Sequence, residues 1–118
     1  MVIELPWPPS KLSRNGSQKD YKGKAKAAKF YRAACLISAR TALMGWNGCD
    51  DGPIMLDMCY RPPTRHRRDL DNLLAMTKQG IDAIASAMRV DDYRFEYTLR
   101  RGEPVKGGRV VVHIGGAA

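Results

Sequence analysis

The sequence lacks the features that mark membrane-spanning or secreted proteins. It contains no apolar run near the ~20 residues that a membrane-spanning helix needs. Residues 1–9 carry three prolines, no basic residue and no long apolar stretch, which does not fit a signal peptide. We therefore expect a cytoplasmic protein that is not inserted in a membrane.

Cysteine is scarce as well. The three cysteines, Cys35, Cys49 and Cys59, are odd in number and widely spaced. This spacing provides neither a disulfide framework nor a zinc motif. We expect the three thiols to be reduced and buried, as free cysteines usually are.

Acidic residues are nearly absent from residues 10–40. Nine lysines and arginines stand there against the single acid Asp20, while the rest of the chain has eleven residues of each sign. The net charge of +8 therefore lies in one stretch, which is typical of a protein with a polyanionic partner. The side chains that we expect to contact a nucleic acid in this stretch are Lys22, Lys24, Lys26 and Lys29. An acidic protein or a membrane surface is the alternative partner.

The composition is otherwise that of an ordinary globular domain. The chain has 118 residues, of which 44% are hydrophobic and 27% are charged. A chain of this length can bury a single core without disulfides. We expect one domain over residues 1–118, with no repeat and no linker.

Apolar periodicity predicts six elements in the order β-α-β-α-β-β. The expected strands are residues 2–5, 53–60, 93–100 and 109–114, and the expected helices are residues 25–44 and 70–88. The first helix is expected to bury Ala27, Phe30, Ala34 and Ile37. Residues 10–24 are expected to form a mobile basic loop, and residues 101–108 a hairpin loop between the last two strands. The prediction is an α+β fold with one mixed sheet and two packed helices.

The most informative stretch joins basic side chains to two carboxylates. Residues 65–74 read RHRRDLDNLL, so arginines run directly into Asp69 and Asp71. Arginine suits phosphate, and paired carboxylates suit a hard cation such as Mg²⁺. A site with both can bind and break a nucleic-acid backbone. The alternative is a plain helix start, with Asp69 as N-cap and Asp71 placed favourably for the helix dipole.

This motif resembles the signature of the RusA family of Holliday junction resolvases. The resemblance rests on RRDLDNL at residues 67–73, and three further segments match in order. They are ELPWPPS at residues 4–10, VDD at residues 90–92 and VKGGR at residues 105–109, followed by alternating valines. Together these matches span nearly the whole chain.

The resemblance implies a small homodimeric endonuclease of phage or prophage type that cuts four-way DNA junctions by paired symmetric nicks. It implies Mg²⁺ as cofactor, with Mn²⁺ as the alternative ion and no organic cofactor. The metal-binding acids would be Asp69, Asp71 and Asp92, and Asp91 could exchange roles with Asp92. The DNA contacts would come from Arg65, Arg67, Arg68 and Asn72.

One position departs from the family pattern. A lysine commonly stands four residues after the second motif acid, where this chain has Ala75. Lys78 begins a matching segment that is displaced by three residues, and it lies on the same helix face as Asp71 and Asp82. Lys78 is therefore either the catalytic lysine or the partner of Asp82 in an i,i+4 ion pair. A helical bulge is another way to absorb the insertion.

Two other functions remain open on the sequence. A non-catalytic DNA-binding protein with the same fold explains the basic charge, but it gains nothing from acids beside phosphates. An RNA-binding module has less support, since the aromatic-glycine signature of the common sheet-based RNA readers is absent.

Overall fold

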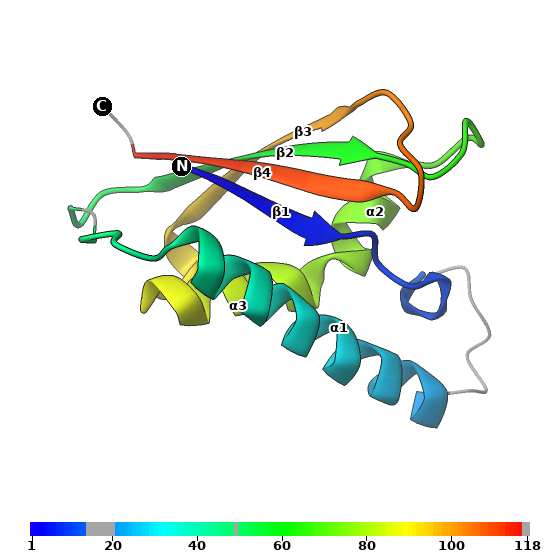
Figure 1. Cartoon of the computed structure of the whole chain (residues 1–118), viewed down its shortest axis with the longest axis horizontal. Helices are drawn as coiled ribbons and strands as arrows, with labels where there is room; N and C mark the ends of the chain where they lie inside the picture. Colours follow the sequence, from blue (N-terminus) through cyan, green and yellow to red (C-terminus); the bar gives the residue numbers. More distant parts are fainter. Residues whose placement is uncertain (14–20, 49, 117–118) are drawn as a thin grey trace.

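The computed structural model of the protein describes residues 1–13, 21–48 and 50–116. These residues form a mixed four-stranded sheet and three α-helices, which confirms the expected α+β class (Figure 1). None of the helices in these ranges is long and apolar enough to cross a membrane. The expected loop at residues 14–20 and the expected burial of Cys49 lie outside the described residues.

The sheet has the strand order β1-β4-β2-β3. The strands are β1 (Val2–Pro6), β2 (Ile54–Arg61), β3 (Phe95–Arg101) and β4 (Arg109–Gly116). The helices are α1 (Tyr21–Ala42), α2 (Leu70–Met76) and α3 (Lys78–Met88), and two short 3-10 turns are η1 (Ser10–Leu12) and η2 (Asp92–Arg94). In Figure 1, α1 and α3 lie on one side of the sheet.

The expected hairpin between the last two strands is wrong. β3 pairs in parallel with β2, because the helices between them return the chain to the same end of the sheet. β4 then runs antiparallel between β1 and β2, so β3 and β4 are not neighbours. Val110 and Val112 of β4 are fully buried, as expected for a strand with a neighbour on each side. Residues 102–108 therefore cross the end of β2 instead of closing a hairpin.

The alternation of apolar residues in the sequence identifies the core-facing side of β2. Ile54, Leu56 and Met58 alternate along the strand and are at most 2% exposed. They face a core that includes Ile84 of α3 and Val112 of β4. Period-two alternation identifies such a face because successive strand side chains point to opposite sides.

The predicted core face of the first helix is wrong. Phe30 and Ile37 are 67% and 69% exposed, whereas Tyr31 and Cys35 are buried. The Tyr31 hydroxyl donates a hydrogen bond to the Pro6 carbonyl (2.7 Å), which satisfies the polar end of a buried ring. The helix also starts four residues earlier than expected, so Lys22 and Lys24 belong to α1 and not to a loop.

Close contact between α1 and α3 explains this choice of face. A Cβ placed on Gly80 would lie 3.1 Å from Leu5, 3.2 Å from the Cys35 sulfur and 3.4 Å from the Tyr31 ring. A side chain at this position would force these neighbours to shift, so the close approach favours glycine. Burial also raises the pKa of the Cys35 thiol to about 11, as expected for an inert cysteine.

The second predicted helix is broken into α2 and α3 at Thr77, so the expectation of two helices is also wrong. The fully buried Thr77 hydroxyl lies 3.0 Å from the carbonyls of Leu73 and Leu74. It also lies 2.8 Å from the Tyr60 hydroxyl of β2. A threonine that bonds back to its own helix bends it, and the break stands directly before Lys78.

Candidate functional site

The start of α2 places the two motif carboxylates in different pockets. Asp69 is the N-cap residue, but its side chain makes no capping hydrogen bond. It lines a pocket of about 590 Å³ that also contains Trp7, Arg67 and Asn72. Asp71, in the first turn of α2, lines a pocket of about 410 Å³ with Lys78 and Tyr97. The capping interaction that offered a purely structural explanation of Asp69 is therefore not formed.

Lys78 brings together two acids that are distant in the sequence. Its ammonium nitrogen lies 3.1 Å from an Asp82 oxygen and 3.1 Å from an Asp92 oxygen. Both hydrogen bonds raise the pKa of Lys78, and the bond from Lys78 lowers the pKa of Asp92. The i,i+4 pair with Asp82 is confirmed, and a second partner is added to it. We call Asp71, Lys78, Asp82 and Asp92 the Lys78 cluster.

The adjacent acids Asp91 and Asp92 have different surroundings. The Asp91 carboxylate accepts a hydrogen bond from the Tyr93 amide (2.9 Å) and caps η2. Asp92 instead points to Lys78. This division favours Asp92 over Asp91 as the acid with a chemical role.

No three His, Cys, Asp or Glu side chains of the described ranges are grouped so that they could hold one metal ion. Asp71 lines the same pocket as Lys78. The Lys78 ammonium is bonded to both Asp82 and Asp92. The role of Asp69, Asp71, Asp91 and Asp92 as metal ligands therefore stays a prediction.

The arginine loop, residues 65–68, is held in shape by its own contacts. Arg68 donates to the carbonyls of Thr64 (2.9 Å) and His66 (3.1 Å). The Arg68 guanidinium lies 5.7 Å from the centre of the Trp7 ring, within cation–π range. Arg101 of β3 donates to the Arg68 carbonyl (3.1 Å). The loop is therefore fixed by an aromatic residue on one side and a strand on the other.

Asn72 has a structural contact. Its amide nitrogen donates to the Ser13 hydroxyl (3.1 Å) and so ties α2 to the segment that follows β1. Asn72 also lines the pocket of Asp69. A DNA contact for this side chain would have to compete with the bond to Ser13.

The basic face of α1 meets the Lys78 cluster at one end. Lys22, Lys26 and Lys29 are exposed, and Lys26 lies 5.9 Å from the centre of the Phe30 ring. Lys24 and Lys78 line the same pocket of about 460 Å³. The positive surface predicted from residues 10–40 therefore extends to Lys78 along the described part of α1.

From the sequence we did not identify three residues that line the pockets beside the arginine loop and Lys78. Arg101 and Glu103 were assigned only to the hairpin loop of residues 101–108, and Tyr97 only to a strand. The one signal available was the Arg100-Arg101 pair, because two successive strand residues point to opposite faces of a sheet. Arg100 lies 3.6 Å from Asp57, and Arg101 reaches the arginine loop.

The ion pairs of Lys78 predict a pH-dependent contribution to stability. Lys78→Met should lower the melting temperature slightly, because these pairs are largely exposed. The lowered pKa of Asp92 gives a contribution that is present above the ordinary aspartate pKa and is lost as the pH falls below it. The raised pKa of Lys78 gives a contribution that is lost only at strongly alkaline pH.

The measurement is the melting temperature of both proteins from about pH 2 to pH 9. The difference between them should be constant near neutrality and should vanish in acid. Lys106→Met, which changes an exposed lysine between β3 and β4, is the control. A difference that does not change with pH would show that the pairs do not form in solution.

Comparison with known proteins places the chain beside one relative. No protein-family model matches the sequence. A protein of Xylella fastidiosa (strain Temecula1), described as uncharacterized, is 37% identical over 118 residues, which cover 97% of this chain and 75% of that protein. Identity at this level over most of both chains shows common descent. The chain therefore belongs to the same family as this Xylella fastidiosa protein.

Proposed function

We propose that this protein is a Mg²⁺-dependent, structure-selective endodeoxyribonuclease of the RusA type. In this proposal it resolves four-way DNA junctions by paired symmetric nicks, in recombination and repair. The observation that carries the proposal is the pairing of Lys78 with Asp92, beside the pocket of Asp71. An exposed lysine that is paired with two acids, and that shares a pocket with Lys24 of the basic helix α1, suits the cleavage of a phosphodiester better than DNA binding alone.

The residues of the Lys78 cluster would have different roles in this reaction. Asp71 and Asp92 supply carboxylate oxygens, the ligands that Mg²⁺ prefers. A bound Mg²⁺ would neutralise charge on the scissile phosphate and acidify a water molecule. Such an ion would compete with the Lys78 ammonium for the Asp92 carboxylate. Lys78, once released from Asp92, could then stabilise negative charge that develops on the phosphate.

The basic residues would position the DNA. Arg65 and Arg67 of the arginine loop and the lysines of α1 can contact the backbone without reading bases. A homodimer suits the substrate, because a two-fold axis places two identical sites at symmetry-related strands of a junction.

The test is a cleavage assay on a synthetic four-way junction with a different label on each strand. In Mg²⁺ we expect paired nicks at symmetry-related positions, and in EDTA no nicks while the junction stays bound. A linear duplex of the same sequence should remain uncut. Binding should weaken steeply with salt, as phosphate contacts require.

The alternative function is a non-catalytic DNA-binding protein with the same fold. Binding of Asn72 to Ser13 and capping by Asp91 are the structural roles that such a protein would keep. Tight junction binding with no cutting in either Mg²⁺ or Mn²⁺ would establish this alternative and overturn the nuclease proposal.

A further inference from the structure

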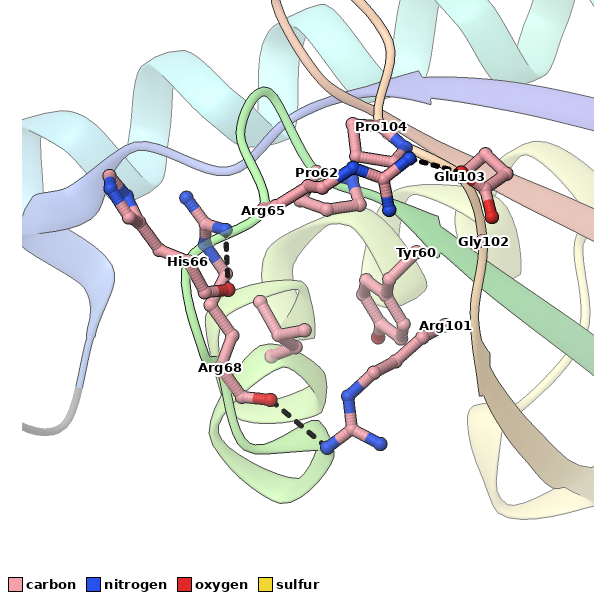
Figure 2. A pocket seen from close by; sticks show the side chains of 10 residues that line it. Tyr60, Pro62, Arg65, His66, Arg68, Arg101, Gly102, Glu103 and Pro104 are labelled. Carbon is pink, nitrogen blue, oxygen red and sulfur yellow. Dashed lines mark hydrogen bonds and ion pairs between the residues drawn. The ribbon is translucent and has the colours of Figure 1, made fainter.

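A second basic site shares Arg68 and Leu73 with the pocket of Asp69. Three segments, of which the third is distant in the sequence from the other two, enclose a pocket of about 490 Å³ (Figure 2). They are the end of β2 with residues 60–62, the arginine loop with α2, and residues 101–104. We call it the Arg101 pocket, and its lining residues are Tyr60, Pro62, Arg65, His66, Arg68, Leu73, Arg101, Gly102, Glu103 and Pro104.

Backbone contacts fix one wall of the Arg101 pocket. The Gly102 amide donates to the Tyr60 carbonyl (2.8 Å), and the Val105 amide donates to the Pro62 carbonyl (2.9 Å). A Cβ on Gly102 would lie 2.6 Å from the Cys59 sulfur, so the chain can pass here only as glycine. The wall is therefore built before any ligand arrives.

The pocket combines an apolar floor with a cationic rim. The floor is formed by the buried Tyr60 and Leu73, with Pro62 and Pro104 beside them. Figure 2 shows Arg65 and Arg101 reaching the pocket from opposite sides. Arg101 donates to the Arg68 carbonyl, and this bond uses one of its five N–H groups.

Glu103, the acidic residue of the rim, forms an ion pair with Arg65. Glu103 lies 2.8 Å from Arg65, and their side chains are 77% and 78% exposed. An ion pair this exposed contributes little to stability. A phosphate, which arginine binds with two parallel hydrogen bonds, can therefore take the place of the Glu103 carboxylate.

We propose that the Arg101 pocket binds one unstacked nucleotide of DNA, with the base on the apolar floor and the phosphate on Arg65 and Arg101. The volume lies within the range of small-molecule sites, roughly 300–1,000 Å³. This inference rests on the proposed function and adds to it the source of structure selectivity. Extruding a base from a duplex costs a few kcal/mol and costs less where pairing is already disturbed, as at the exchange point of a junction.

The first test uses 2′-deoxyadenosine 5′-monophosphate as probe, followed by amide chemical shifts in an NMR titration. The nucleotide should shift signals of the arginine loop and of residues 101–103, and inorganic phosphate should bind more weakly. Arg101→Ala should weaken nucleotide binding about tenfold, in line with a lost charged hydrogen bond. Glu103→Gln should strengthen binding several-fold, because it frees Arg65.

The neighbouring arginine provides the matched control. Arg100 belongs to the same strand and carries the same charge, but it lies beside Asp57 and does not line the pocket. Arg100→Ala should leave nucleotide binding unchanged. An equal loss in Arg100→Ala and Arg101→Ala would reduce the effect to general attraction of anions and overturn the proposal.

The second test uses a four-way junction with 2-aminopurine at the exchange point. Binding should raise the fluorescence of this base as it leaves the stack, and Arg101→Ala should abolish the rise. Junction cutting without nucleotide binding and without this rise would overturn the pocket proposal alone. Nucleotide binding and a rise in a protein that never cuts would support the pocket and overturn the nuclease proposal.

Discussion

Asp71→Asn is expected to lower the rate of junction cutting by about a hundredfold or more, while the junction stays bound. A metal ligand contributes several kcal/mol to charge stabilisation, and each 1.36 kcal/mol corresponds to a factor of ten in rate. Binding should persist or tighten, because the substitution removes a negative charge from a surface that meets phosphate. The measurements are single-turnover cleavage in Mg²⁺ and gel-shift binding in EDTA.

The structure supports the use of this variant as a probe of function. Asp71 is exposed in the first turn of α2, where a negative charge contributes ~0.3–1 kcal/mol through the helix dipole. Asp51→Asn changes an exposed aspartate in the bend before β2 and should leave cutting unchanged. Loss of junction binding together with a lowered melting temperature in Asp71→Asn would assign this residue a folding role instead.

Gly108→Ala is expected to destabilise the protein by about 2–5 kcal/mol. Gly108 has a φ of +72°, a conformation that costs other residues roughly 1–2 kcal/mol. An added Cβ would also lie 2.8 Å from Trp7 and 2.9 Å from Pro63, and such overpacking costs typically ~1–3 kcal/mol more. Trp7 also contacts Arg68, so the displaced ring should disturb the arginine loop.

The preceding glycine separates the two costs. Gly107 has a φ of +79°, but nothing lies within 4 Å of an added Cβ. Gly107→Ala should therefore cost only about 1–2 kcal/mol, the price of the left-handed conformation. Chemical denaturation of both variants measures the difference. Equal destabilisation would show that the contact of Gly108 with Trp7 relaxes without cost.

Prediction and structure agree on the core face of β2 but differ on the core face of α1. Alternation identified the core face of β2, since a strand has only two faces. On α1, apolar residues occur at helical spacing on more than one face, and periodicity selected Phe30 and Ile37, which are exposed. The choice depended on Gly80 of α3 and the Pro6 carbonyl, which are distant in the sequence.

In the candidate site too, local contacts were predicted and contacts between distant residues were not. The sequence of residues 65–74 indicated a site with arginines next to carboxylates. The ion pair of Lys78 with Asp82 could also be predicted, because the two residues are four positions apart. The second partner of Lys78 stands 14 residues away, beyond the end of α3. Arg65 and Glu103 are separated by 38 residues, and no local pattern relates them.

The positive charge of residues 10–40, the α+β class and the approximate limits of most elements follow from local sequence, because they depend on neighbours a few residues apart. The position of β4 between β1 and β2, the buried face of α1 and the pairing of Lys78 with Asp92 became apparent only in the folded chain. These outcomes depend on contacts between distant segments, where packing and hydrogen bonding select one arrangement among several that satisfy the same local pattern.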